Sequence, residues 1–174
     1  MVRYTHQQQT QWLASLDARP SSAAVIIQNS QEQALIVKAN YKAHWSFPGG
    51  VIDAGETPLV AAVRETAEEV GLAVDSAQLR LAMTACRVSQ ATLSYQFIFV
   101  TSLPDEMLDG IQLQDSEIDA CRWISRAEVL QGAIPAHWAL VAWANRHTGY
   151  FETAIGRDIY DSSQEKITNH KESL

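Results

Sequence analysis

The sequence lacks most features that mark membrane or secreted proteins. It contains two cysteines, Cys86 and Cys121, and no Cys-x-x-Cys spacing. This usage predicts reduced thiols rather than a disulfide framework. No apolar run approaches the roughly 20 residues that a membrane-spanning helix needs. The polar N-terminal segment 1–7 leads into further glutamines, so no signal peptide is predicted. We therefore expect a cytoplasmic protein that does not bind membranes.

Basic residues are also scarce. There are 13 Lys and Arg against 20 Asp and Glu, which gives a formal net charge of −7. Because binding to nucleic-acid backbones depends on Lys and Arg contacts, this balance argues against general nucleic-acid binding. An acidic protein can still bind phosphate groups when metal cations lie between its carboxylates and the ligand. The sequence must then contain carboxylates that are placed to hold such a cation.

The length of 174 residues fits one domain with a sizeable core. Hydrophobic patterning predicts strands at 23–27, 34–37, 45–47, 79–85, 93–101 and 120–124, and helices at 8–16, 58–70, 126–130 and 135–147. The polar turn 29–32 predicts a hairpin between the first two strands. Strands and helices interleave without regular βαβ repetition, which favours a mixed sheet flanked by helices. The polar tail 162–174 is expected to fray.

The helix at 58–70 has clear signals at both ends. Thr57 suits the N-cap and Pro58 suits the first helical position, where its missing N–H costs little. Gly71 suits the left-handed residue that often follows a helix. At about 100° per residue, one face of this helix is apolar and consists of Leu59, Val63, Ala67 and Val70. The opposite face is acidic and consists of Glu65, Glu68 and Glu69.

The acidic face has two interpretations. A solvated face of an amphipathic helix is the simpler one. However, like charges at these spacings cost about 0.2–0.5 kcal/mol per pair, and anions near a helix C-terminus oppose its dipole. A divalent cation would offset both costs, since Mg²⁺ prefers carboxylate oxygens. The residues alone leave both interpretations open. Arg64 can pair with Glu68 or Glu56, so it need not touch a substrate.

The segment 50–72 resembles the signature of the Nudix hydrolases, G-x5-E-x7-R-E-U-x-E-E-x-G-U, in which U is a bulky aliphatic residue. Eight signature positions are matched by Gly50, Glu56, Arg64, Glu65, Glu68, Glu69, Gly71 and Leu72. Thr66 stands at the first U position and is the one departure, which affects packing more than chemistry. The order of predicted elements also agrees with the Nudix fold over about 20–147.

This resemblance implies a single α/β domain, an α/β/α sandwich with a mixed sheet, in which the signature forms a loop–helix–loop. It implies that Mg²⁺ or Mn²⁺ is held by Glu65, Glu68 and Glu69, which are catalytic, while the loop is ordered by Gly50, Glu56 and Arg64. The implied reaction is hydrolysis of a diphosphate linkage in a nucleoside diphosphate derivative or a nucleoside triphosphate, by attack of water on phosphorus. In some family members the base is the glutamate that matches Glu65, and in others it comes from outside the signature.

Glu117 is the outside carboxylate that we favour. It directly precedes the predicted strand 120–124, a place where family members often carry an acidic residue. A solvated acidic loop accounts for the same pattern, and Asp115 and Asp119 are weaker candidates. Glu117 is therefore predicted to contact the metal or the attacking water.

Other residues near the segment are assigned to structure rather than chemistry. His44 could line the pocket but is expected at the surface. Tyr41 and Trp45 could stack on a base or sugar, but Trp45 is expected to support the loop from the core instead. Cys86 is interpreted as a small core residue because no activating partner can be assigned to it.

Two other classes stay open. A catalytically silent Nudix-fold domain that binds nucleotides or regulates usually lacks a signature glutamate, and none is missing here. Isopentenyl diphosphate isomerase shares the fold but departs from the signature. Markers of substrate subfamilies are absent; Arg87, for example, stands where ADP-ribose hydrolases carry proline. A small nucleotide-like substrate is the expectation, and a homodimer stays open.

Overall fold

The computed structural model describes residues 5–88 and 93–154. Its helices are α1 (His6–Ala14), α2 (Pro58–Val70), the 3-10 turn η1 (Ser76–Gln78), α3 (Asp105–Leu108), α4 (Arg126–Leu130) and α5 (Trp138–Ala144). Its strands are β1 (Ser21–Gln28), β2 (Ala34–Ala39), β3 (Gly49–Val51), β4 (Arg80–Val88), β5 (Leu93–Ser102), β6 (Ile118–Ile124) and β7 (Gly149–Ala154).

The seven strands form one mixed sheet in the order β6-β2-β1-β5-β4-β7, with β3 added against β1. β1 runs parallel to β5 and β4 runs parallel to β7, while the other pairs are antiparallel. One edge of β1 is shared, because β3 pairs with residues 22–24 and β2 pairs at Gln28. The loop that leads into α2 is thereby fixed against the start of the central strand.

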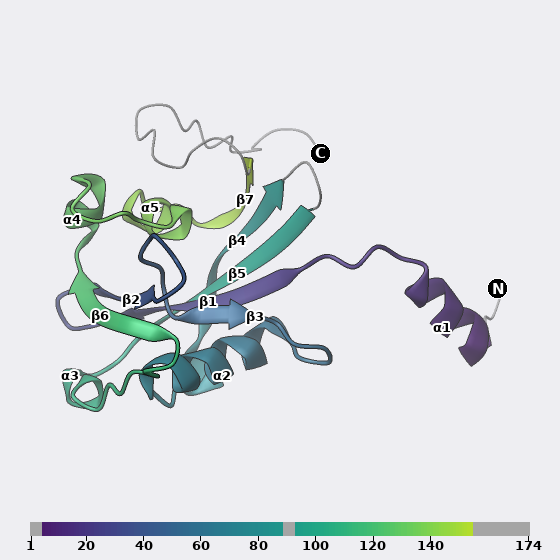
Figure 1. Ribbon diagram of the computed structural model, residues 1–174, viewed down its shortest axis with the longest axis horizontal. Helices are drawn as coiled ribbons and strands as arrows, with labels where there is room; N and C mark the ends of the chain where they lie inside the picture. The colour runs from purple at the N-terminus through teal and green to yellow at the C-terminus, as the bar shows by residue number, and fades with distance from the viewer. Residues whose placement is uncertain (1–4, 89–92, 155–174) are drawn as a thin grey trace.

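Alternation along β1 divides the core into two layers. Ala24 and Ile26 pack with the residues of α4 and α5, whereas Val25 and Ile27 pack with the residues of α2. Successive side chains of a strand point to opposite faces, so the two helical layers cover opposite sides of the sheet. Figure 1 shows α2 on one side and α4 with α5 on the other. The predicted α/β/α sandwich is confirmed.

Helix α2 begins and ends where the sequence predicts. Thr57 Oγ1 accepts a hydrogen bond from the Val60 N–H at 3.3 Å, and Gly71 adopts a left-handed φ of 71°. Thr66 is fully buried, and its hydroxyl donates to the Ala62 carbonyl at 2.8 Å. This bond leaves the hydroxyl satisfied inside an apolar layer. The departure from the family signature at Thr66 is therefore accommodated within the helix itself.

The hairpin at 29–32 is confirmed, but the predicted elements at 45–47 and 135–147 differ from the structure. No strand forms at 45–47, where only isolated bridges join Ser46 to Val37 and Trp45 to Ala136. The bridge at Trp45 holds 135–137 extended, so α5 begins at Trp138 and Pro135 lies outside it. Strand β7 was not predicted at all, and it extends the sheet past residue 147 by pairing with β4.

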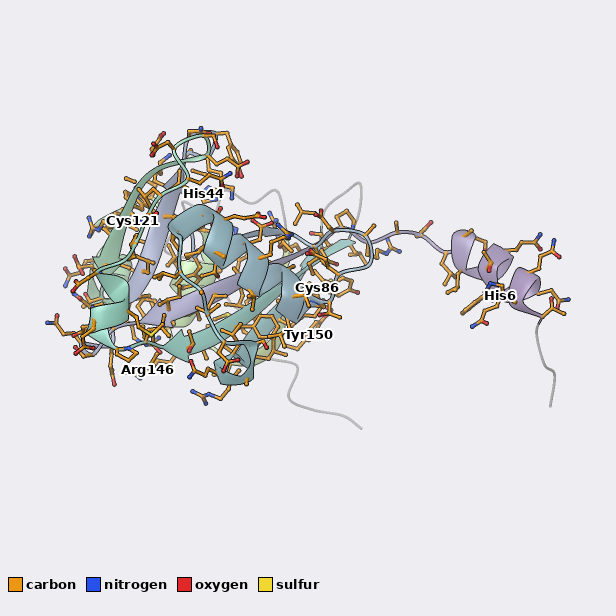
Figure 2. The ribbon with its side chains drawn as sticks, turned by 90° about the horizontal axis from the view of Figure 1, so that it is seen from below. His6, His44, Cys86, Cys121, Arg146 and Tyr150 are labelled. Carbon is orange, nitrogen blue, oxygen red and sulfur yellow. The ribbon has the colours of Figure 1, made fainter. Side chains whose placement is uncertain are left out.

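Helix α1 stands apart from the sheet, at the end of an extended segment (Figure 1), and none of its residues is buried. Cys86 on β4 and Cys121 on β6 are both free, as expected, and Figure 2 shows them on different strands of the sheet. Within the described ranges, no helix has the length and apolar character needed to cross a membrane. The predicted fraying of 162–174 lies outside the described residues.

The connection between residues 40–48 and α5 depends on His137. Its main-chain N–H donates to the Trp45 carbonyl at 2.8 Å, and its Nδ1 accepts from the Ala139 N–H at 3.4 Å. Its ring stacks on His44 with centroids 5.0 Å apart. Burial, and then the neighbouring charges of His44, Arg87 and Lys42, lower the pKa of His137 to about 3. The folded protein thus keeps this imidazole neutral.

We predict that replacing His137 by Asn, which keeps an N-cap acceptor but does not titrate, flattens the acid side of the stability profile. Below pH 6.5 the unfolded chain protonates His137 while the folded chain, with a pKa of about 3, does not. Stability from this group is therefore complete above pH 6.5 and is lost as pH falls toward 3, by at most about 1.4 kcal/mol per pH unit. Thermal unfolding between pH 7 and 4 measures this slope. Identical slopes in wild type, His137→Asn and the exposed control His6→Asn would contradict the prediction.

Candidate active site

Two glycines let the loop before α2 approach its surroundings closely. Gly49 has a φ of 149°, and a Cβ added there would overlap the carbonyl oxygen of Ala23 on β1. A Cβ at Gly50 would lie 2.5 Å from Oε1 of Glu65. Neither position accepts a side chain without a shift of its neighbour. Gly50 was predicted to order the loop, and the sequence also indicated that Gly49 needs a backbone shape closed to other residues, which its φ of 149° agrees with.

Arg64 connects the loop, the strand and the helix. Its guanidinium forms a bidentate pair with Glu56, Nε to Oε1 at 2.8 Å and Nη2 to Oε2 at 2.9 Å. Nη2 also donates to the Val51 carbonyl at 3.1 Å, at the end of β3. Nη1 donates to Glu65 at 2.8 Å and to Glu68 at 3.0 Å. Arg64 thus makes both pairings that the sequence allowed, with Glu56 and with Glu68, and it adds Glu65.

Glu56 is held at both of its oxygens. Hydrogen bonds from Arg64, and then one from the Asp53 N–H, lower the pKa of Glu56 to about 2. That N–H donates to Oε2 of Glu56 at 3.1 Å, which closes the loop on itself. A carboxylate that accepts several charge-assisted hydrogen bonds stays ionised. In this structure Glu56 and Arg64 are placed to order the loop.

The three carboxylates of α2 do not share one solvated face, so the simpler of the two interpretations of the acidic face is wrong. Glu69 is buried, with 3% of its surface exposed, and Glu68 is the exposed member. The buried face of α2 consists of Ala61, Ala62, Thr66, Glu69 and Val70, while Ala67 is exposed. The loop 48–51 covers the side of the helix that the projection left to solvent, and its Gly49 N–H donates to Oε2 of Glu69 at 2.7 Å.

Burial leaves negative charge on this face poorly compensated. Burial raises the pKa of Glu69 to about 7, although the Gly49 hydrogen bond and the charge of Lys42 act in the opposite direction. Burial also raises the pKa of Glu65, against the effect of Arg64. Carboxyl groups whose charged forms are disfavoured in this way mark functional sites more often than other surfaces.

The donor set suits a hard divalent cation, although the carboxylates do not enclose a site. Among the described residues, no group of three or more His, Cys, Asp or Glu is arranged to hold a metal ion. Protein donors engage the carboxylates instead, Arg64 on Glu65 and Glu68, and Gly49 on Glu69. To bind a cation, Glu68 and Glu65 would need to turn away from Arg64. The cation would offset the burial and the charges of Glu65 and Glu117, which raise the pKa of Glu69. Oxygen ligands of this kind fit Mg²⁺ or Mn²⁺.

Glu117 lies beside this face because a loop is bonded to the end of α2. The N–H groups of Gln112 and Gln114 donate to the carbonyls of Val70 at 3.0 Å and Glu69 at 3.2 Å. The Glu117 carbonyl then accepts from the Asn40 N–H at 2.9 Å. The Glu117 charge raises the pKa of both Glu65 and Glu69, so it acts on the same site. Asp115 and Asp119 are exposed, and no interaction brings them to α2 in the described part of the chain.

Loop 40–48 forms the other border of the site. His44, which was expected at the surface, is half-buried and stacks on His137. Trp45 packs against the core and bonds through its main chain to Pro135 and His137, as expected of a supporting residue. Tyr41 is 68% exposed. Lys42, which the sequence did not single out, is the cation whose charge reaches Glu69.

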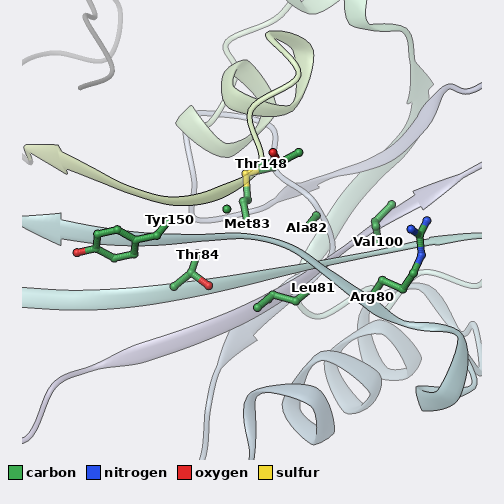
Figure 3. Close-up of a pocket in the computed structure, with 9 residues that line it drawn as sticks. Arg80, Leu81, Ala82, Met83, Thr84, Val100, Thr148 and Tyr150 are labelled. Atoms are coloured by element: carbon green, nitrogen blue, oxygen red, sulfur yellow. The ribbon is translucent and has the colours of Figure 1, made fainter. Parts of the chain in front are cut away.

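A hollow of the described surface lies away from this site. It has a volume of about 530 Å³ and is lined by residues of β4, β5 and β7, among them Arg80, Leu81 and Tyr150 (Figure 3). No residue of segment 50–72 lines it, and none of its side chains is a carboxylate. It is therefore not the candidate active site.

Comparison with known proteins agrees with this geometry. Residues 18–144 match the family described as the NUDIX domain. Phosphatase NudJ of Escherichia coli K12 is 32% identical over 117 residues, which covers 66% of this chain and 74% of NudJ.

Solved structures share the fold. A binary complex of the C. elegans Ap4A hydrolase aligns with a TM-score of 0.59 at 21% identity, over 73% of this chain and 93% of that protein. The NUDIX domain of Shewanella oneidensis NrtR, complexed with ADP ribose, aligns with a TM-score of 0.62 at 17% identity, over 79% of this chain and 95% of that domain.

Proposed function

We propose that this chain, which belongs to the Nudix hydrolase family, hydrolyses a diphosphate linkage in a small nucleotide-like substrate with Mg²⁺ or Mn²⁺ bound at α2. One observation carries the proposal. Arg64 gathers Glu56, Glu65 and Glu68 around the glycine loop while Glu69 is buried beside them. This arrangement concentrates carboxylates where a diphosphate bridged by a cation can reach them.

Different residues of the chain are proposed to hold the cation, order the loop and accept a proton. Glu65, Glu68 and Glu69 are proposed to hold the cation, while Glu56, Arg64 and Gly50 fix the loop. When bound, the cation would polarise a phosphoryl oxygen and make a coordinated water more acidic. Glu117 is proposed to accept the proton of the attacking water, because its charge acts on both Glu65 and Glu69 from a separate loop. Glu65 is the competing base, since burial raises its pKa toward neutral pH.

The similar proteins suggest a class of substrate but do not indicate one substrate within it. NudJ is described as a phosphatase, and the structurally similar proteins include an Ap4A hydrolase and a domain that binds ADP ribose. We propose a nucleoside diphosphate derivative or a nucleoside triphosphate, cleaved by a single domain in the cytoplasm. Free Cys86 and Cys121 agree with that reducing compartment. Incubation with Mg²⁺ and ADP-ribose, Ap4A and nucleoside triphosphates tests this class, and no turnover of the panel would favour a silent binding domain.

The first prediction from this proposal concerns Glu69. Glu69→Gln keeps an oxygen that can accept the Gly49 hydrogen bond but removes a ligand charge, so we expect turnover to fall about a hundredfold or more. The variant should melt at least as high as wild type without metal, because the buried charge is gone. Steady-state rates on the best substrate of the panel, with thermal unfolding in parallel, measure both effects. Glu106→Gln, an exposed change on α3, is the matched control. A folded Glu69→Gln protein with near wild-type turnover would contradict the assignment of the α2 carboxylates as the cation ligands.

The second prediction concerns Glu117. If Glu117 positions or deprotonates the attacking water, Glu117→Gln should lower kcat roughly a hundredfold. Stabilisation by Mg²⁺ should survive, because the α2 carboxylates remain. The measurement is the rate-versus-pH profile of wild type, Glu117→Gln and Glu65→Gln at saturating Mg²⁺. An unchanged rate and profile in Glu117→Gln would return the base role to Glu65 or to another carboxylate.

A further inference from the structure

Arg87 near the end of β4 is a cation without an anionic partner among the described residues. Its Nε–H is buried and has no hydrogen-bond partner, and none of the ion pairs of the described residues includes it. Burial lowers the pKa of Arg87, and no acidic side chain opposes that effect. Arg64, by contrast, is surrounded by carboxylates. A partly buried guanidinium without a counter-charge destabilises the folded chain, so a role outside folding is expected.

The strand register places Arg87 on the face of the sheet under α5. Residues two apart on a strand share a face, so Arg87 lies on the side of Met83 and Ala85, which are core residues of that layer. Gln96 on β5 lies opposite Ala85 and is the diagonal neighbour of Arg87 on the same face. Its Oε1 is also buried without a partner. A half-turn of the amide would present its NH₂ group at the same place.

Two imidazoles complete the surroundings of Arg87. His44 and His137 are stacked, and burial is the main cause that lowers the pKa of each, with the charge of Arg87 acting on both. Both rings are therefore neutral at pH 7. Because Nδ1 of His137 accepts from the Ala139 N–H, its proton lies on Nε2 and makes that atom a donor. The cluster offers donors and no carboxylate.

Lys42 links this cluster to the α2 carboxylates. Its charge lowers the pKa of Glu69 and also lowers the pKa of both His44 and His137. Arg87, Lys42 and the two neutral imidazoles thus form a cluster of donors within a chain of net charge −7, and the charge of Lys42 acts both on this cluster and on Glu69 of the acidic face. A ligand that spans the two would need an anionic end for Arg87 and a cation-bridged end for the carboxylates.

We propose that Arg87 binds a phosphoryl oxygen of the substrate on the side of the diphosphate turned away from the α2 carboxylates. The inference rests on the proposed function and deepens it, because it makes recognition of a second anionic group part of substrate binding. A guanidinium suits this role, since its fixed donors match phosphate oxygens. The Arg87 charge that destabilises the free protein is neutralised when substrate binds.

The first test needs no turnover. In metal-free buffer with chelator, inorganic pyrophosphate should raise the melting temperature of wild type, and Arg87→Met should lose this shift. Arg87→Met alone should melt about 2–4 °C higher than wild type, because it removes an unpaired cation. Arg126→Met is the matched control. Arg126 is also partly buried, but it donates to the Trp143 carbonyl and lies 4.3 Å from that ring, so its loss should lower the melting temperature and keep the pyrophosphate shift.

The second test is kinetic. With the best substrate of the panel and Mg²⁺, Arg87→Met should raise KM about 10- to 100-fold and change kcat only a few-fold, and Arg87→Lys should restore part of the loss. A pyrophosphate shift that persists in both Arg87→Met and Arg87→Gln would overturn the proposal. The proposal would also be overturned if Arg87→Met kept the pyrophosphate shift but lost a melting-temperature shift that a nucleoside causes in wild type. That result would assign the cluster to binding of the base. If the panel shows no turnover but the pyrophosphate shift depends on Arg87, the anion site stands and the hydrolase proposal fails.

Discussion

The hydrogen bonds of the Arg64 guanidinium are the constraint on which the active-site geometry depends. One side chain bonds to the end of β3, to the loop carboxylate of Glu56 and to two carboxylates of α2. The single positive charge of Arg64 is paired with three carboxylates, whereas the negative charge of each carboxylate on α2 is compensated only in part. The loop, strand and helix are therefore fixed relative to one another, and the acidic face keeps negative charge that a divalent cation can use.

Glu69 and Arg87 are both charged side chains whose burial is poorly compensated, and their charges are opposite. Glu69 is buried beside other carboxylates and its pKa rises to about 7, while Arg87 is partly buried and no anion pairs with it in the described part of the chain. Each position lowers the stability of the free protein, and each would gain a partner when a cation and a phosphorylated ligand bind together. Lys42 lies within electrostatic range of both Glu69 and the two imidazoles. Such an arrangement would let a chain with an excess of acidic residues accept the proposed anionic substrate.

The sequence predicted the local features of the candidate site better than its packing. The spacing of the signature predicted α2 to the residue and both partners that Arg64 could take, because helix caps and charge pairs are local effects. The projection of α2 placed Glu69 on the face opposite the apolar one, but it could not show that the loop at Gly49 folds over that side and buries Glu69. Pro135 suggested a helix start, but the bridge between Trp45 and Ala136 overrides that local preference. Strand β7 was missed because its pairing with β4 joins segments far apart in the sequence.

The claim that α2 binds a divalent cation is tested most directly by thermal unfolding as a function of Mg²⁺ concentration. A cation that binds only the folded chain stabilises it by about 2.7 kcal/mol at a hundredfold excess over its Kd, so the wild-type melting temperature should rise with Mg²⁺ and level off only slowly. Glu68→Gln removes one ligand and should shift the curve to higher Mg²⁺, while Glu106→Gln should follow wild type. Superimposable curves for wild type and Glu68→Gln would contradict the account and place the cation elsewhere.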